Sequence, residues 1–270
     1  MAWTGTELLL ATERLSAVCV LLQSLEWLQV RAVFADQGVW RYALLAPEQR
    51  ALPFGLSVLC RLSLPYTRFV VLLGLRCAAA LLVLFLGESR VWPFLCISQI
   101  LVCVRFRGAS NGGSDSMSVV LTSALSLPVL FGRTPLAIQA ALFYIGVQVT
   151  LSYVIAGLAK LRQPDWRDGS ALRHFVSSSP YGVPAWFARV LEQRALAALS
   201  SWAVLAFECL FPLAWLDPRL CLLWLLFGAM FHAANVFSLG LNRFFWAWLA
   251  GYPAMFASSQ LVRVLSGWSN

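Results

Sequence analysis

Long apolar runs recur along almost the whole chain, and short polar segments separate them. Bounding each run by charged residues, glycine and proline gives eight segments, at 15–34, 69–87, 91–105, 117–132, 136–159, 196–216, 219–240 and 244–262. Runs of roughly 20 apolar residues can cross a hydrocarbon core of about 30 Å as helices. Alternation with a period of two is absent from the sequence. The pattern therefore predicts an all-α, polytopic transmembrane bundle of about eight helices.

Two connections between these runs are long enough to carry structure of their own. The first covers about 35–68 and contains an apolar piece, ALPFGLSVLCRL, at 51–62. The second covers about 160–195, where Pro184 can open a helix. One face of that helix would carry Trp186, Phe187, Val190 and Leu191. We expect one or two interfacial helices that lie along the membrane surface.

Composition supports a membrane protein and excludes several other classes. The 270 residues are 60% hydrophobic and 12% charged, with a mean hydropathy of +0.75, which is far from a soluble domain. No repeat or change in composition divides the chain, so a single domain over 1–270 is expected. The net charge of +8 is spread over loops without a basic run, so the expected partner is the lipid bilayer and not a nucleic acid.

The cysteines and histidines do not have the spacing along the chain that metal ligands have. Seven cysteines stand singly, mostly inside apolar runs, and only two histidines are present. These cysteines are interpreted as small buried hydrophobic residues, and no metal is expected because no ligand spacing occurs.

The orientation of the chain in the membrane can be predicted from the basic residues of its loops. Counting Arg and Lys in the loops of the eight-span arrangement places the loop after Lys160 in the cytoplasm. One missed helix would reverse this count.

Lys160 is the only lysine, because the other 19 of the 20 basic residues are arginine. An amine can lose its proton when it is partly buried, whereas a guanidinium stays charged. Lys160 could therefore act as a base. It could equally anchor a helix end at the membrane interface by extending its amine toward water.

Polar residues inside the apolar spans mark further candidates, because such groups are costly at membrane depth and must face the interior of the bundle or a cavity. Glu26, Arg76 and Glu208 are charged residues in spans. A structural or a functional role is equally compatible with a lone glutamate. After Glu208, the next span supplies a polar stripe that faces inward, formed by His232, Asn235 and Ser238.

The fifth span and a polar loop add further positions. Tyr153 and Lys160 are seven residues apart with Gly157 between them on the same face. Gly157 would admit either a flat ligand or another helix backbone. In the loop RGASNGGSDSM, Asn111 marks a tight turn, and Asp115 or its neighbour Ser114 could cap the following helix.

Two stretches together resemble a known family. YVIAGLAKLRQPDWRDGSAL, at 153–172, has an aromatic residue, IAG, a lysine, Asp-Trp and an acidic-Gly pair. FHAANVFSLGLNRFFWAWLAGYPAMF, at 231–256, has a histidine followed three residues later by asparagine, then Phe-Ser-x-Gly and a long apolar helix. Between them, Glu208 and Pro212 form a Glu-x-x-x-Pro element. These features resemble the vitamin K-dependent gamma-glutamyl carboxylase superfamily, and the chain is identified as a member of its bacterial HTTM-type branch.

The resemblance implies a chemistry for these residues. In the carboxylases, the lysine after IAG is thought to deprotonate vitamin K hydroquinone, whose oxidation by O2 generates the strong base that removes a glutamate γ-proton. That lysine corresponds to Lys160, with His232 as a second catalytic residue. The remaining candidates would line the site of a vitamin K-like quinol, namely Tyr153, Gly157, Asn235, Glu208 and Asn111.

The chain also departs from the family. The carboxylases carry a large extramembrane domain that binds a propeptide, and the helices predicted here leave no room for it, so propeptide-directed carboxylation is not expected. Where the family has a histidine after an asparagine, Asn111 is followed by glycine. The family topology also places the lysine end outside the cytoplasm, against the charge count.

Two functions remain open, both in a bacterial cytoplasmic membrane. In the first, the protein is a quinol-linked lyase or oxidoreductase that modifies a peptide with Lys160 as base. In the second, it is a non-catalytic accessory protein for maturation or export of a secreted peptide, working with a partner membrane chain. A transporter using Glu26 and Glu208 is a weaker alternative, because the sequence shows no paired half-repeats.

Overall fold

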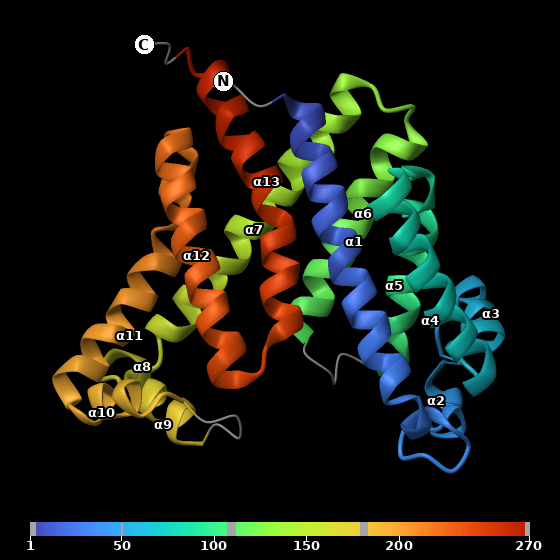
Figure 1. The fold of residues 1–270 in the computed structure, drawn as a ribbon, viewed down its shortest axis with the longest axis horizontal. Coiled ribbons are helices and arrows are strands. Elements are labelled where there is room, and N and C mark those ends of the chain that lie inside the picture. The colour runs from blue at the N-terminus through green and yellow to red at the C-terminus, as the bar shows by residue number, and fades with distance from the viewer. Residues whose placement is uncertain (1–3, 50, 107–111, 179–182, 268–270) are drawn as a thin grey trace. The chain divides into compact units, whose positions relative to one another are not determined.

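The computed structural model describes residues 4–49, 51–106, 112–178 and 183–267, and every regular element within these ranges is helical (Figure 1). Each of the eight predicted spans overlaps a long helix, although the helix of the span 15–34 begins at Gly5, ten residues before the predicted start. These helices are α1 (Gly5–Gln29), α4 (Tyr66–Leu81), α5 (Trp92–Phe106), α6 (Gly112–Leu130), α7 (Pro135–Leu161), α11 (Arg194–Cys209), α12 (Pro218–Leu239) and α13 (Asn242–Leu265). The all-α prediction is confirmed.

Five helical stretches in the described part of the chain are long and apolar enough to cross a membrane. They are Gly5–Gln29, Tyr66–Leu86, Ser89–Phe106, Pro135–Leu161 and Pro218–Leu239. Their length and composition support an integral membrane protein in a lipid bilayer. The number of eight spans remains approximate, because α11 is shorter than these five stretches and α6 and α13 are less apolar.

Short helical elements connect the long ones. They are η1 (Arg31–Phe34), α2 (Tyr42–Gln49), α3 (Phe54–Ser63), the π-helical η2 (Leu82–Leu86), η3 (Ser89–Val91), α8 (Pro164–Arg167), α9 (Ser170–Ser177), α10 (Ala185–Glu192) and η4 (Phe211–Trp215). Helices α3 and α10 occupy the two segments predicted as interfacial helices. The sequence pattern did not predict α2, α8 or α9.

Proline and glycine set several helix ends. Pro135 and Pro218 occupy the first positions of α7 and α12, where the missing N–H costs no helical hydrogen bond. The Asp217 carboxylate caps α12 by accepting a hydrogen bond from the backbone N–H of Arg219 at 2.7 Å. At the other end, Gly240 has φ 67°, a left-handed conformation that glycine adopts without strain.

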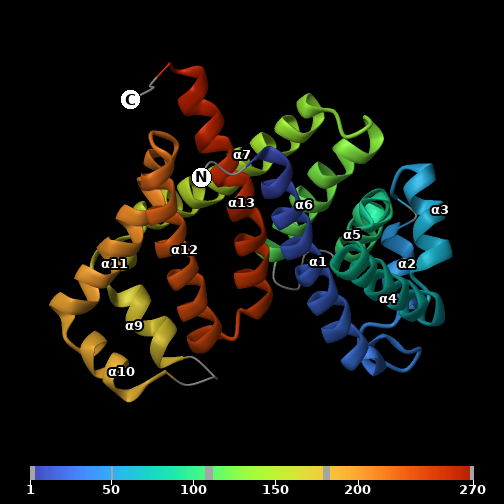
Figure 2. The ribbon, with the colours of Figure 1, turned by 45° about the horizontal axis from the view of Figure 1, so that its top comes forward.

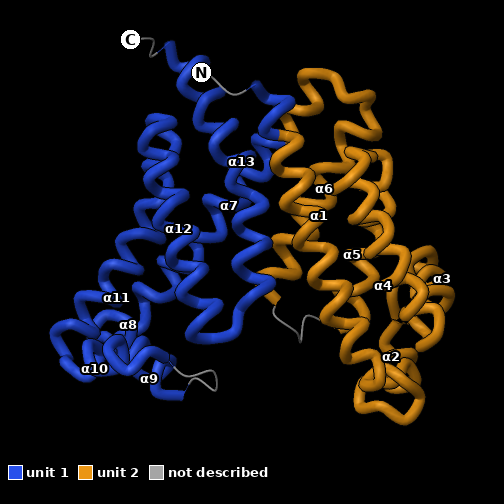
Figure 3. The backbone as a smooth tube through the Cα atoms, viewed as in Figure 1, with its two compact units in different colours: residues 1–8, 142–270 blue, residues 9–141 orange. Residues whose placement is uncertain are grey.

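The backbone groups into two compact units, residues 9–141 and residues 1–8 with 142–270 (Figure 3). Within the unit of residues 1–8 and 142–270, which is unit 1 in Figure 3, α12 and α13 lie side by side in both ribbon views (Figures 1 and 2). The single domain over 1–270 stays a prediction.

In the unit of residues 9–141, Arg76 on α4 is fully buried and is surrounded by neutral polar groups. Its guanidinium donates hydrogen bonds to the side-chain oxygens of Gln23, Ser24, Ser98 and Gln99, at 2.7 to 3.1 Å. These groups come from α1 and α5. Because a buried cation is costly unless its donors are used, Arg76 joins three helices through one side chain.

The same network corrects the prediction that Asp115 caps a helix. Helix α6 begins at Gly112, so Asp115 lies inside its first turn. The Asp115 side chain is buried and accepts a hydrogen bond from Nε2 of Gln23 at 2.9 Å. Since Gln23 also binds Arg76, the carboxylate is linked to the guanidinium through an intervening amide.

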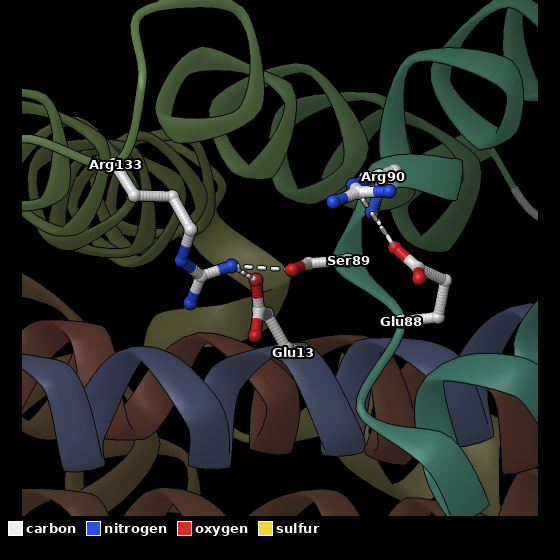
Figure 4. Close-up of polar contacts among 5 residues, drawn as sticks. All are labelled: Glu13, Glu88, Ser89, Arg90 and Arg133. Atoms are coloured by element: carbon white, nitrogen blue, oxygen red, sulfur yellow. Dashed lines mark hydrogen bonds and ion pairs between the residues drawn. The ribbon is translucent and has the colours of Figure 1, made fainter.

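A second buried charge in this unit is satisfied by an ion pair. Glu13 on α1 has a side chain only 3% exposed, and its Oε1 lies 3.1 Å from Nη1 of Arg133 in the turn between α6 and α7. Arg133 also donates to the hydroxyl of Ser89 (Figure 4). Arg133 has φ 53°, which is strained for a side chain other than glycine. The ion pair therefore holds this turn against α1.

Two substitutions test the role of the Glu13–Arg133 ion pair. One breaks this buried pair, and the other breaks the nearby ion pair of Glu88 and Arg90, which is exposed and serves as the control (Figure 4). We expect Arg133→Gln to lower the free energy of unfolding by about 2–4 kcal/mol, since it leaves the Glu13 carboxylate buried without its counter-charge. Arg90→Gln should change stability by no measurable amount. Melting temperatures in nanodiscs compare the two, and equal melting temperatures would contradict a structural role for the buried pair.

Candidate functional site

A cavity of about 260 Å³ lies within the unit of residues 1–8 and 142–270. Its polar lining residues are Ser152, Lys160, Glu208, His232 and Asn235. The rest of its wall is apolar or aromatic and consists of Tyr153, Ala156, Trp166, Leu172, Phe175, Val204, Phe231, Leu239, Leu241, Phe244 and Trp248. A concave, mostly apolar space with a few convergent polar groups is the usual form of a small-molecule site.

Lys160 and Glu208 form an ion pair in the cavity wall. The Lys160 Nζ, in the last turn of α7, lies 2.6 Å from Oε1 and 2.7 Å from Oε2 of Glu208 on α11. The Glu208 side chain is 3% exposed and the Lys160 side chain 21% exposed. The ammonium also lies 5.3 Å from the ring centroid of Trp166, within cation–π range. Each charge tolerates burial because the other neutralises it.

Gly157 explains how α7 comes close enough to α11 for this pair. A Cβ atom added at Gly157 would lie 2.8 Å from the Cys209 sulfur, 2.9 Å from the Glu208 Cβ and 3.0 Å from the Cys209 backbone nitrogen. Gly157 thus lies at a close helix–helix contact, where small residues let backbones approach. It is one turn from Lys160 and does not line the cavity.

His232 on α12 belongs to a hydrogen-bonded chain of three side chains. Its Nε2 lies 2.7 Å from the Tyr153 hydroxyl, which lies 2.7 Å from the Tyr252 hydroxyl of α13. The other ring nitrogen, Nδ1, has no hydrogen-bond partner among the described residues. His232 is 2% exposed, so an unpaired nitrogen at this depth is unusual.

Aromatic rings fix the remaining walls of the cavity. The rings of Phe244 and Trp248 stack with centroids 4.0 Å apart, and the His232 ring lies 5.4 Å and 5.3 Å from them. The Trp248 indole N–H donates to the Ser152 hydroxyl oxygen at 3.1 Å. Ser152 in turn donates to the Val149 carbonyl, so the one hydrogen of its hydroxyl is used within the protein.

The turn between α8 and α9 positions the end of the cavity that carries Trp166 and Phe175. Asp168 accepts hydrogen bonds from both the hydroxyl and the backbone N–H of Ser170, at 2.7 and 2.9 Å. These two hydrogen bonds lower the pKa of the exposed Asp168 carboxyl below its ordinary value. Trp166 is held from the other side, because its carbonyl accepts a hydrogen bond from Ser201.

The structure brings five of the predicted site residues to one cavity: Tyr153, Lys160, Glu208, His232 and Asn235. Gly157 supports the site without lining it. Asn111 lies outside the described residues. Among the residues that the structure does describe, no three His, Cys, Asp or Glu side chains are grouped so that they could hold a metal ion.

Apart from Tyr153, sequence reasoning did not assign the aromatic residues of the site, nor Tyr252, to the site. A signal was present, because Phe244, Trp248 and Tyr252 recur every four residues and so lie on one face of α13. In a chain that is 13% aromatic, such a stripe is as typical of ordinary core packing as of a ligand site. Trp166 had no periodic signal, since it lies in the four-residue helix α8.

The fold and the site define a polytopic α-helical membrane protein with an aromatic-lined cavity. Residues 137–259 match the family model of the HTTM domain, as the resemblance predicted, and this range contains every lining residue of the cavity. The match lies almost entirely in the unit of residues 1–8 with 142–270. No curated protein and no solved structure matched the chain.

The close approach at Gly157 makes a direct prediction. Gly157→Ala should lower the free energy of unfolding by about 1–3 kcal/mol, because the new methyl group overlaps Cys209 and separates α7 from α11. Gly74→Ala on α4 is the matched control, because a Cβ there meets no atom within 4 Å, and it should stabilise the helix by about 1 kcal/mol or less. Thermal unfolding in nanodiscs measures both, and equal effects would contradict the proposed contact.

Proposed function

We propose that the cavity binds the head group of a lipid-soluble quinol and that the Lys160–Glu208 pair takes up its hydroxyl proton. The observation that carries this proposal is a pair formed by a partly buried lysine and a buried glutamate in the wall of an aromatic cavity. A purely structural pair has no need of adjoining space. The proposal makes the protein a quinol-linked enzyme of a bacterial cytoplasmic membrane, with a peptide side chain as the group it modifies.

The size and lining of the cavity fit a quinol-like head group. About 260 Å³ is close to the lower end of the roughly 300–1,000 Å³ usual for ligand pockets. This suits one or two fused rings better than a stretch of peptide. Flat aromatic walls such as Phe244 and Trp248 would pack against the rings. Lys160, His232 and Asn235 would hold the polar atoms.

A quinol supplies reducing equivalents and, once deprotonated, reactivity toward O2. The chain's own residues would move the proton. Lys160 Nζ would accept the hydroxyl proton while it passes one of its own protons to an oxygen of Glu208. Lys160 then remains an ammonium beside the new negative charge, and Glu208 becomes neutral. Charge is conserved, and the developing anion keeps a cation next to it in a low-dielectric site.

A specific observation favours the accessory role as the second candidate. Both carboxylate oxygens of Glu208 are already bound by Lys160, as in a pair whose role is to join α7 to α11. In that case the protein would support maturation or export of a secreted peptide together with a partner membrane chain, and no proton would be transferred.

Lys160→Arg separates the two candidates. Arginine can still bind Glu208 through two hydrogen bonds, so the fold is expected to persist, but a guanidinium does not give up its proton. Quinol-dependent O2 uptake by the purified protein in nanodiscs, tested with vitamin K hydroquinone and menaquinol, should fall about 100-fold or more. Glu208→Gln should have a similar effect.

The control variant for this experiment is Arg263→Gln, which removes the ion pair with Asp217 away from the cavity and should leave uptake unchanged. Uptake that persists in Lys160→Arg would remove the proton-transfer role. No uptake by the wild-type protein above empty nanodiscs, with a normal melting temperature, would favour the accessory role.

A second prediction concerns occupancy of the cavity. Ala156→Phe on α7 places a ring in the lining of the cavity and should abolish binding of 2-methyl-1,4-naphthoquinone, because the space is then filled. Ala159→Phe, three residues further along the same helix, changes an exposed position that does not line the cavity, and it should bind as the wild type does. Equilibrium dialysis in nanodiscs measures both, and equal binding would place the ligand elsewhere.

A further inference from the structure

A second cavity lies between α9 and α10, in the same unit as the first, and we call it the α9–α10 groove. Its volume is about 480 Å³, within the roughly 300–1,000 Å³ usual for ligand pockets. No described residue lines both the groove and the cavity that contains Lys160. The groove is therefore a separate site, with its own polar and apolar groups.

Helix α9 separates the two spaces because it has two different faces. Leu172 and Phe175 lie on one face and line the first cavity. The opposite face carries four polar residues with the spacing i, i+3, i+4 and i+7, which share one side of a helix. All four line the groove, namely Ser170, Arg173, His174 and Ser177. The groove is thus a polar space on the far side of an amphipathic helix.

Close contacts hold both walls of the groove. A Cβ atom added at Gly169, directly before α9, would lie 2.5 Å from the carbonyl carbon of Ala197 and from the nitrogen of Ala198 on α11. Helix α10 packs against α11 as well, and its Leu191 is only 2% exposed. The groove therefore lies between two helices that are both fixed to the bundle.

The groove lies where the chain leaves the membrane. Helices α8, α9 and α10 follow directly on α7, one of the five helical stretches long and apolar enough to cross a bilayer. Helices α9 and α10 have eight residues each, which is too short to cross a hydrocarbon core of about 30 Å. Short amphipathic helices in such a place lie along the membrane surface, so lipid head groups are the nearest abundant molecules.

The groove wall carries opposite charges that are open to a ligand. Arg173, His174 and Glu192 are exposed, and none of their side chains has a hydrogen bond or ion pair with another described residue. Asp168 interacts with Arg173 only at longer range, because its carboxylate binds Ser170. A purely anionic ligand would meet the Glu192 carboxylate, and a purely cationic ligand would meet the guanidinium. The pair therefore selects a ligand with both charges.

We propose that the α9–α10 groove binds the head group of a phospholipid that carries both a phosphate and an ammonium group, as phosphatidylethanolamine does. The guanidinium of Arg173 matches phosphate oxygens in charge and geometry, and the His174 imidazole can add a donor. Glu192 accepts hydrogen bonds from the ammonium group. Val176 and Ala188, which also line the groove, contact the glycerol and the upper acyl chains. This site goes beyond the proposed function and does not depend on it.

Lipid titration of the purified protein in detergent, read by native mass spectrometry, tests the site. The wild-type protein should bind phosphatidylethanolamine about 10-fold more tightly than phosphatidylglycerol with the same acyl chains. Arg173→Gln and Glu192→Gln should each weaken phosphatidylethanolamine binding by about 10-fold, because each removes a charged hydrogen-bonding group. Arg189→Gln is the matched control, since Arg189 is exposed on α10 and does not line the groove, and it should change nothing.

Reversing one charge gives a sharper result than removing it. Glu192→Lys should turn the preference toward phosphatidylglycerol, which carries the phosphate without an ammonium group. Asp165→Lys makes the same charge change at an exposed position of α8 outside the groove and should leave the preference as it was. Equal effects of the two variants, or equal binding of the two lipids by the wild-type protein, would overturn the proposal.

The source of the head group is tested with free O-phosphoethanolamine, which lacks the apolar part and should compete weakly with the lipid. Competition at the same concentration as the lipid would assign the groove to a soluble compound and overturn the lipid site. Binding of 2-methyl-1,4-naphthoquinone by Arg173→Gln should equal that of the wild type, because the two spaces share no described lining residue. A large loss would contradict the separation of the two sites. Absence of quinol-dependent O2 uptake would count against the proposed function alone.

Discussion

The contact between Lys160 and Glu208 is the constraint on which the cavity depends. Neither charge could be buried alone without a large desolvation cost, so α7 and α11 must meet where the two side chains reach each other. Gly157 makes that meeting close. Once the two helices are fixed in this way, Tyr153 and Ala156 of α7 and Val204 of α11 become walls of the same space.

Arg76 and Lys160, one in each unit, have different kinds of hydrogen-bond partners. Arg76 is surrounded by neutral amide and hydroxyl oxygens, none of which takes a proton from it at ordinary pH. Lys160 faces a carboxylate, which can. An amide and hydroxyl environment holds a charge in place, whereas an acid–base pair can also redistribute a proton when a third group arrives. This difference is a physical reason to place chemistry in the cavity of residues 152–248 and a structural role at Arg76.

Much of the fold could be predicted because membrane helices are long and strongly apolar, so each of the eight runs became a helix. The polar members of the site, such as Glu208 and His232, were found for the same reason: a costly group stands out in an apolar segment. Trp166 and Tyr252 could not be assigned to the site from the sequence, since aromatic residues are common both in hydrophobic cores and in ligand sites. The pairing of Lys160 with Glu208 is a tertiary contact across 48 positions, and no local pattern encodes it.

Gly228 restricts which residue can stand at the distant position 252, because a side chain at position 228 would compete with Tyr252 for the same space. Any side chain there would occupy the space in which the Tyr252 and Tyr153 oxygens meet. Positions 228 and 252 are therefore not free to vary independently among relatives of this chain. A relative with a larger residue at the first position would have to carry a shorter one at the second. The residue pair at positions 228 and 252 in each related sequence would then show whether that protein retains the hydrogen bond between the two tyrosine hydroxyl groups.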